Sequence, residues 1–276
     1  MTIIILNGRL GNNMFQIAFG EMLSYYHGAK VLFVPKSRNT GNLKYFKKLS
    51  NSKLFFLPFN LLFLFKIFSK TSVYKTVIQE NQFDTFLPAK EFSNVILSGY
   101  FQYTEYITKL KSHWSEFFTI NPEFVQEFKA DYNRYFGQNR VLTIHVRLGD
   151  YLSVNFKAVS STAFVGWDWY KKALSNLNLD DFDTIFLISD EPSKAKDGLN
   201  LNVRNLVFSD GKEITDLQLL MNTDVAIISN SSFAWWGAFL NIKPQKQVYA
   251  PNNWIGYKEG IEFPTGIMIE EFIWVE

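Results

Sequence analysis

The stretch TIIILNGRLGNNMFQIAFGEMLSYYHGAKVLFV, residues Thr2–Val34, contains the pattern that decides the fold. It starts with an uninterrupted apolar run, Thr2–Leu6, which is typical of a strand in a parallel sheet covered on both faces. A loop rich in Gly and Asn follows. Apolar residues then recur at helical spacing as far as Tyr25, and Gly28 is the expected helix end. Val31–Val34 is a second apolar run, so the order of elements predicts a βαβ unit.

The same alternation continues along the chain. Strands are expected at Val95–Leu97, Val141–Val146, Thr184–Ser189, Val203–Val207, Val225–Ser229 and Val248–Ala250. Helices are expected at Thr104–Phe117, Pro122–Phe136, Trp167–Leu177, Glu213–Asn222 and Phe233–Leu240. Strands that alternate with helices in this way predict an α/β fold with parallel sheets. The polar turn at 137–139 predicts a boundary between a first domain, 1–138, and a second, 139–276.

The composition excludes several kinds of site. The 276 residues include no cysteine, which rules out disulfides, a cysteine nucleophile, iron–sulfur clusters and thiolate zinc sites. Three scattered histidines do not suggest a metal centre. The apolar start of the chain lacks a basic flank, so we expect no signal peptide and a cytoplasmic location.

A net charge of +2 conceals a basic segment. Between Met22 and Gln79 there are nine Lys, one Arg and no acidic residue, whereas the rest of the chain carries a charge of −8. Inside this segment Leu54–Phe68 is strongly apolar, but it is too short for a membrane span and contains Pro58 and Lys66. Two interpretations stay open: a buried helical hairpin, or a peripheral contact with the inner face of the plasma membrane.

The first polar loop follows the strand Val141–Val146, at a strand end where α/β proteins bind ligands. His145 and Arg147 share one face of this strand. An arginine here can hold two phosphate oxygens and keeps its charge. Asp150 can orient Arg147, receive a substrate hydroxyl or act as a base, and His145 is the second candidate base. A mechanism without a dedicated base, and an Arg–Asp pair of structural value only, are the alternatives.

A second polar loop opens the helix after Val225–Ser229. Its residues are Asn230, Ser231, Ser232 and Phe233. Ordinary capping is one interpretation, because Asn and Ser side chains accept hydrogen bonds from helix amides. A phosphate site is the other, since the same amides and the helix dipole attract anions. Of the following pair, Trp235 and Trp236, we expect one to pack in the core, because neighbours on a helix point in different directions.

Two more loops complete the set. Ser189 and Asp190 end a strand, where a carboxylate can accept hydrogen bonds from ribose hydroxyls or a guanine edge; a solvated turn is the alternative. Gly8–Asn13 follows the first strand, and its glycines permit close approach of a ligand, but it lacks the third glycine of the dinucleotide fingerprint. The D-x-D motif at Asp181–Asp183 precedes its strand, so we do not expect it to hold a metal.

Four segments in this order resemble the signatures of the α-1,2-fucosyltransferases, glycosyltransferase family 11. They are GRLGNNMFQIAFG, HVRLGDY, SDE and NSSFAWWGAFLN, at residues 8–20, 145–151, 189–191 and 230–241. The resemblance implies a GT-B-like α/β fold, with two Rossmann-like lobes facing across a cleft. The lobe 1–138 is then the acceptor side, with a variable basic and apolar insert at about 36–90, and the lobe 139–276 binds GDP-fucose.

The resemblance also implies a reaction: inverting transfer of L-fucose from GDP-fucose to the 2-hydroxyl of a terminal galactose, with no metal or other cofactor. It implies that Arg147 binds the diphosphate and that Asn12 lies by the reacting sugar, while His145 and Asp150 complete the catalytic set. Leu148 stands where the family commonly has a second arginine. The expected donor-binding residues are Gly11, Arg147, Ser189, Asp190, Asn230, Ser231, Ser232 and Phe233.

The acceptor and partners follow less directly. A galactoside glycan of an O-antigen, capsule or oligosaccharide is expected, lipid-linked if the basic segment contacts a membrane, and no nucleic acid is expected. Two other functions stay open. One is a fucosyltransferase of another linkage or acceptor, for example in protein O-fucosylation. The other is a non-catalytic carbohydrate-binding protein, whose seven Trp and 13 Tyr would stack on sugars.

Overall fold

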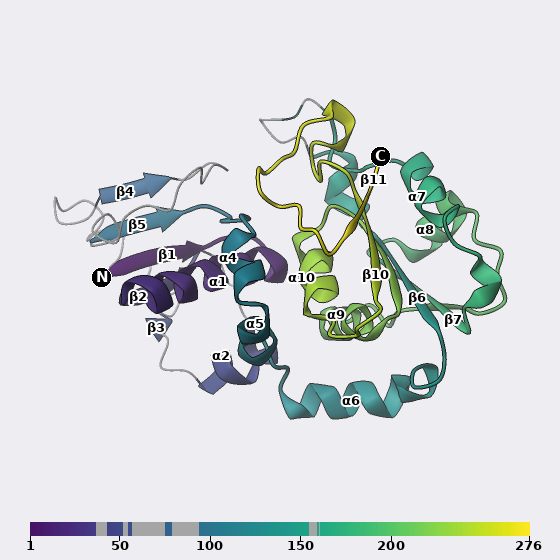
Figure 1. The fold of residues 1–276 in the computed structure, drawn as a ribbon, viewed down its shortest axis with the longest axis horizontal. Coiled ribbons are helices and arrows are strands. Elements are labelled where there is room, and N and C mark those ends of the chain that lie inside the picture. The colour runs from purple at the N-terminus through teal and green to yellow at the C-terminus, as the bar shows by residue number, and fades with distance from the viewer. Residues whose placement is uncertain (37–42, 52–54, 57–74, 79–93, 155–158, 160) are drawn as a thin grey trace. The chain divides into compact units, whose positions relative to one another are not determined.

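The computed structural model describes residues 1–36, 43–51, 55–56, 75–78, 94–154, 159 and 161–276. They form two compact units, 1–121 with 264–266, and 122–263 with 267–276. Each unit contains a parallel sheet (Figure 1). The helix that begins at Pro122 clusters with the second unit, whereas the boundary expected at 138 places it in the first.

The first unit contains a sheet in the order β3-β2-β1-β5-β4. Its strands are β1 (Thr2–Leu6), β2 (Val31–Pro35), β3 (Phe55–Phe56), β4 (Lys75–Ile78) and β5 (Val95–Ser98). Helix α1 (Leu10–His27) connects β1 to β2, which pair in parallel, so the βαβ unit is confirmed. Gly28 ends α1 in the left-handed conformation that glycine adopts without strain, as predicted.

The other α-helices among the described residues of this unit are short: α2 (Lys47–Asn51), α4 (Glu105–Lys109) and α5 (Lys111–Phe117). The single helix expected at Thr104–Phe117 is interrupted, because Leu110 leaves the helical region at φ −119° and ψ 34°. Of the apolar stretch Leu54–Phe68, only Phe55–Phe56 belongs to the described residues, as strand β3 beside β2. The hairpin and the membrane contact expected there lie outside the described residues. Within the described part of the chain, no helix has the length and apolar character needed to cross a bilayer.

The second unit has a six-stranded sheet in the order β11-β10-β9-β6-β7-β8. Its strands are β6 (Val141–Val146), β7 (Thr184–Ser189), β8 (Leu206–Phe208), β9 (Val225–Ile228), β10 (Gln247–Pro251) and β11 (Ile273–Val275). The chain builds outward from β6 to β8 and then returns to the other edge of β6 with β9. This is the doubly wound Rossmann order, and it creates a topological switch point between β6 and β9, where such folds bind ligands.

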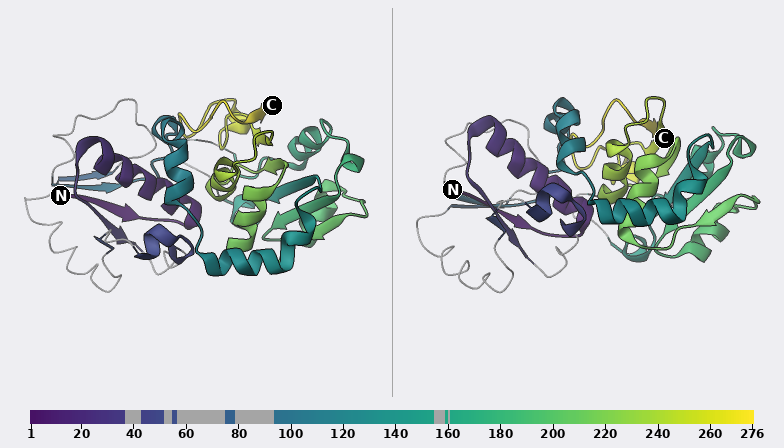
Figure 2. Two further views of the ribbon diagram at one scale, coloured as in Figure 1. Left: turned by 60° about the horizontal axis from the view of Figure 1, so that its bottom comes forward. Right: turned by 90° about the horizontal axis from the view of Figure 1, so that it is seen from below.

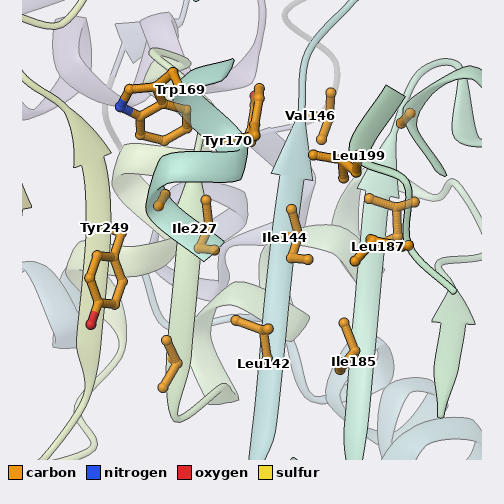
Figure 3. Close-up of a cluster of buried hydrophobic side chains, with 14 of the residues drawn as sticks. Leu142, Ile144, Val146, Trp169, Tyr170, Ile185, Leu187, Leu199, Ile227 and Tyr249 are labelled. Atoms are coloured by element: carbon orange, nitrogen blue, oxygen red, sulfur yellow. The ribbon is translucent and has the colours of Figure 1, made fainter. Parts of the chain in front are cut away.

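Helices cover both faces of this sheet. On one face lie α7 (Trp167–Leu174) and α8 (Pro192–Leu199). On the other lie α9 (Glu213–Asn222) and α10 (Ser232–Leu240), with α6 (Pro122–Tyr132) packed against α9 (Figure 2). Leu142, Ile144 and Val146 of β6 point toward α7 and form the core there (Figure 3). The alternation of a strand leaves the intervening residues, His145 among them, on the α10 face.

Both Trp235 and Trp236 are fully buried, so the expectation that only one packs in the core is wrong. The reason is that α10 is enclosed on more than one side. Trp235 contacts the ring of Phe272, from the last segment of the chain, at 6.0 Å between ring centroids. On another side α9 packs closely, since a Cβ at Gly237 would lie 2.7 Å from Leu220 Cβ.

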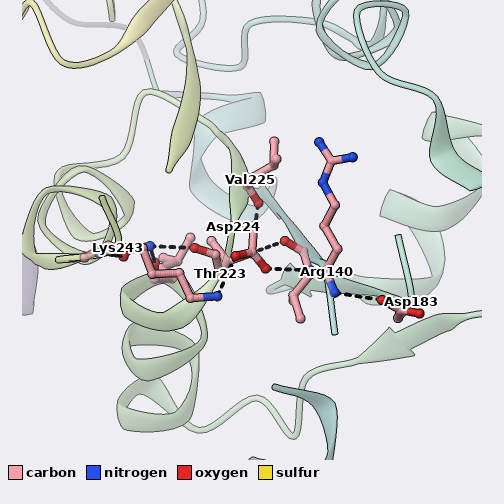
Figure 4. Close-up of polar contacts among 9 residues, drawn as sticks. Arg140, Asp183, Thr223, Asp224, Val225 and Lys243 are labelled. Carbon is pink, nitrogen blue, oxygen red and sulfur yellow. Dashed lines mark hydrogen bonds and ion pairs between the residues drawn. The ribbon is translucent and has the colours of Figure 1, made fainter. Parts of the chain in front are cut away.

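Charged residues fix the edge of the sheet where its strands begin (Figure 4). Asp183 accepts a hydrogen bond from the Arg140 amide at 2.7 Å, and the Arg140 guanidinium lies 3.6 Å from Asp181. The two carboxylates of the D-x-D motif are therefore engaged with one arginine, away from the ends of the strands. Among the described residues no group of three or more His, Asp or Glu side chains is arranged to hold a metal ion.

Asp224, which precedes β9, predicts a measurable stability effect. Its carboxylate accepts hydrogen bonds from the Val141 amide at 2.8 Å and from Lys243 Nζ at 2.7 Å. Asp224→Ala is expected to lower the free energy of unfolding by about 1–3 kcal/mol, because a partly buried amide loses its acceptor. Urea unfolding measures the change. Asp224→Asn keeps an acceptor and should retain most of the stability; an unchanged midpoint in the alanine variant would contradict this role.

Candidate active site

Polar side chains gather where β6, β7 and β9 end. Strand β6 pairs with β9 as far as His145 and Ile228, and with β7 as far as Val146 and Ser189. Three strand ends are thus adjacent at one edge of the sheet. The predicted residues of the second unit lie in these strand ends, in the loops that follow them or in the first turn of α10, so the structure brings them to one place.

His145 joins β6 to β9. Its Nδ1 lies 2.9 Å from Ser229 Oγ, and its carbonyl accepts hydrogen bonds from the Tyr170 hydroxyl at 3.2 Å and the Ser229 amide at 3.2 Å. Burial, and secondarily the positive charge of Arg147, lowers the pKa of His145 to about 4. The imidazole is therefore neutral at neutral pH and a weak base. Neither Ser229 nor Tyr170 was among the predicted site residues.

The lowered pKa of His145 predicts a pH dependence of stability. In the unfolded chain the pKa returns toward 6.5, so between pH 6.5 and about 4 the unfolded state binds a proton that the folded state does not. This contribution is complete above pH 6.5 and is lost as the pH falls toward 4. Wild type should lose roughly 1–3 kcal/mol more than His145→Gln over that interval. Urea unfolding of both at pH about 7 and 4.5 tests this, and parallel losses would contradict it.

Arg147 extends from the end of β6 and lies between two carboxylates. Its Nη2 is 2.6 Å from Asp150 Oδ1, and its Nη1 is 3.1 Å from Asp190 Oδ2. The guanidinium carbon lies 5.7 Å from the ring centroid of Tyr151, within range of a cation–π contact. The Arg147 side chain is 18% exposed, so the cation is largely enclosed but still reachable from solvent. The three charged residues expected in the site therefore form one cluster.

Tyr151 connects this cluster to the loop after β9. Its hydroxyl donates to the Asn230 carbonyl at 3.3 Å. The Asn230 Nδ2 donates to the Ala163 carbonyl at 2.8 Å, whereas its buried Oδ1 has no hydrogen-bond partner among the described residues. Tyr151 was not predicted as a site residue, although it closes the segment HVRLGDY. The sequence signal that could have indicated Tyr151 is a phenol directly after the Gly–Asp turn.

Helix α10 begins at Ser232, two residues after Asn230. Ser231 is its N-cap residue and is buried, but its hydroxyl makes no cap hydrogen bond, so the capping interpretation does not hold for this residue. The first turn contains Ser232 and Phe233, whose ring centroid is 6.2 Å from that of His145. At the other end Lys246 Nζ donates to the carbonyls of Ala238 and Asn241, each at 2.6 Å. The dipole of α10 is thus compensated at its C-terminus, while its N-terminus favours an anion.

Two further motif residues, Leu148 and Ser189, make contacts within the protein that hold their loops in place. Leu148, in place of a second arginine, is fully buried in the core cluster beside β6, so a charge there would be buried without water. The Leu148 amide donates to Asp190 Oδ1 at 2.9 Å. Ser189 Oγ accepts from the Glu191 amide at 3.1 Å and so closes the turn before α8.

Asn12 and Gly11 lie in the first unit, in the first turn of α1. Asn12 Oδ1 accepts a hydrogen bond from Gln102 Nε2 at 3.0 Å, and a side chain at Gly8 would collide with the Asn12 amide. Buried Gln16 holds the same loop, since it accepts from the Asn7 amide at 3.0 Å. Gln102 was not predicted, because its 90-residue separation from Asn12 left no signal in the sequence pattern.

The parallel sheets and strand-end loops are those of a GT-B-like glycosyltransferase. The chain belongs to glycosyl transferase family 11, whose family model matches residues 1–258. It is similar to an Escherichia coli alpha-1,2-colitosyltransferase, with 24% identity over 94% of both chains. It is also similar to the Escherichia coli O-antigen biosynthesis glycosyltransferase WbnK, with 24% identity over 68% of this chain and 67% of the relative.

Solved structures support the same fold. Arabidopsis thaliana FUT1, as a mutant in complex with GDP, aligns with 91% of this chain and 69% of its own, at 12% identity and a TM-score of 0.58. The fucosyltransferase NodZ from Bradyrhizobium aligns with 86% of this chain and 91% of its own, at 13% identity and a TM-score of 0.50. The expected GT-B-like class, with its Rossmann-like sheets, is therefore confirmed.

Proposed function

We propose that this chain transfers L-fucose from GDP-fucose to the 2-hydroxyl of a terminal galactose on a glycan, with inversion and without a metal. The observation that carries the proposal is Arg147, held at the end of β6 and linked through Tyr151 to the loop that opens α10. A guanidinium and helix amides are suited to the charge that develops on a departing diphosphate. One such donor is worth roughly 3–4 kcal/mol of barrier.

The relatives support the finer parts of this proposal. The linkage in the name of the colitosyltransferase favours transfer to a 2-hydroxyl. GDP bound to the Arabidopsis protein favours a GDP-activated donor. The role of WbnK in O-antigen biosynthesis favours a glycan acceptor, which we place in the cytoplasm on a lipid carrier.

Arg147→Ala should lower kcat/KM for GDP-fucose by about 10²–10³-fold and leave the chain folded, because the leaving diphosphate loses its cation. Arg140→Ala is the matched control. Arg140 stands just before the same strand, at its opposite end, and its partner is Asp181. Initial rates and circular dichroism of both variants provide the comparison. Full activity of the Arg147 variant, or an equal loss in the Arg140 variant, would contradict the assignment.

We propose Asp150 as the group that takes the proton of the acceptor hydroxyl. Its side chain is 49% exposed, whereas His145 is buried and its pKa is lowered to about 4. Asp150→Asn should lower kcat by about 10²–10⁴-fold while the KM for GDP-fucose changes little. Steady-state kinetics distinguish the two parameters. Wild-type kcat in this variant would instead favour a mechanism without a dedicated base.

The first experiment for the proposed function is a transfer assay with EDTA present. GDP-fucose is offered with lactose, N-acetyllactosamine and Galβ1,3GalNAc, and products are identified by mass and linkage. A product fucosylated at O2 of galactose supports donor, linkage and metal independence together. Because the colitosyltransferase aligns over 94% of both chains, a GDP-activated colitosyl donor forms a second arm. Transfer only from that donor overturns the fucosyl assignment, and absence of GDP binding overturns the proposal altogether.

A further inference from the structure

Asp190 uses both carboxylate oxygens within the protein. Oδ2 lies 3.1 Å from Arg147 Nη1, and Oδ1 accepts the Leu148 amide at 2.9 Å. The acid follows β7, whereas both of its partners follow the neighbouring strand β6. A carboxylate held at two points has a fixed orientation, so it also orients the guanidinium of Arg147.

The other carboxylate on Arg147 is held differently. Asp150 lies in the same loop as the arginine, and its side chain is 49% exposed, compared with 26% for Asp190. Exposed ion pairs within one turn contribute little and are readily exchanged for a stronger anion. The pair with Asp190 joins two strands and is less accessible to water. Of the two contacts, that with Asp190 is therefore the one suited to hold the guanidinium while a ligand approaches Nη2.

Gly149 explains how the carboxylate fits. At this residue, whose φ is +20°, a Cβ would overlap Asp190 Oδ2. Three successive residues of the loop thus accommodate one carboxylate. Arg147 contributes its side chain, Leu148 its amide and Gly149 the space left by a missing side chain.

We propose that Asp190 is a positioning residue for Arg147, and that Gly149 serves to leave room for it. Asp190 thereby acts on the donor's diphosphate through the arginine, in place of the contact with ribose or guanine that the sequence suggested. This inference rests on the proposed function, in which Arg147 binds the diphosphate. It explains why the HVRLGDY and SDE segments lie next to each other: the carboxylate of one positions the arginine of the other.

A double-mutant cycle tests the proposal with GDP as the probe, by calorimetry. Asp190→Asn keeps an acceptor for the Leu148 amide but removes the negative charge that faces the guanidinium of Arg147. It should weaken GDP binding roughly tenfold in the wild-type background and less than about twofold in Arg147→Ala, because only the arginine transmits the effect. The KM for GDP-fucose should rise in parallel, and binding of guanosine, which lacks phosphate, should be unchanged.

Gly149→Ala should reproduce the loss, because its methyl group displaces the carboxylate. Gly137→Ala is the matched control: Gly137 has a φ of +85°, but a Cβ there meets nothing within 4 Å. A tenfold loss that persists in Arg147→Ala, or an equal loss of guanosine binding, would mean that Asp190 contacts the nucleoside itself and would overturn the proposal. Failure of wild type to bind GDP would instead reject the proposed function, and it is seen before any variant is compared.

Discussion

Strand β6 forms hydrogen bonds with β7 on one side and with β9 on the other, and this pairing places three strand ends next to one another. A parallel sheet puts all its carboxyl ends on the same edge, so loops far apart in sequence meet there. Arg147, Asp190 and Asn230 owe their proximity to this pairing. The contacts between His145 and Ser229 and between Tyr151 and Asn230 then extend the β6–β9 pairing beyond the strands.

The strands that could be predicted are those whose apolar run is uninterrupted and whose ends carry turn residues. Thr2–Leu6, Val141–Val146 and Thr184–Ser189 form with the expected bounds because burial on both faces demands a continuous apolar sequence. The short edge strand β11 (Ile273–Val275) was not expected, since three residues give no periodicity. Helix α8 was missed because its polar sequence, PSKAKDGL, has only Ala195 and Leu199 buried.

For the site, the sequence indicated which residues meet, but of their mutual contacts it indicated only the pair of Arg147 and Asp150. His145, Arg147, Asp150 and Asp190 were each considered for a ligand, because strand ends in open sheets bind ligands. In the structure Arg147 contacts Asp150 and Asp190, and His145 contacts Ser229. Distances and burial decide this, and neither is encoded in local spacing. The same holds for Trp235 and Trp236: helical geometry correctly separates their directions, but it contains no information on how many sides of α10 other segments would cover.

Lys246 neutralises only the C-terminal end of α10, and this affects how anion attraction at the other end depends on salt concentration. Dissolved ions screen exposed charges within about 10 Å at 0.1 M salt, but they screen buried ones much less. Ser231, at the uncompensated end, is 8% exposed, and Arg147 beside the same strand ends is largely enclosed. Dissolved salt therefore weakens the field of the α10 N-terminus only slightly, whereas the charge of Arg147 is already paired with two carboxylates. Attraction of an anion by the first amides of α10 persists at salt concentrations that abolish contacts between surface lysines and the same anion.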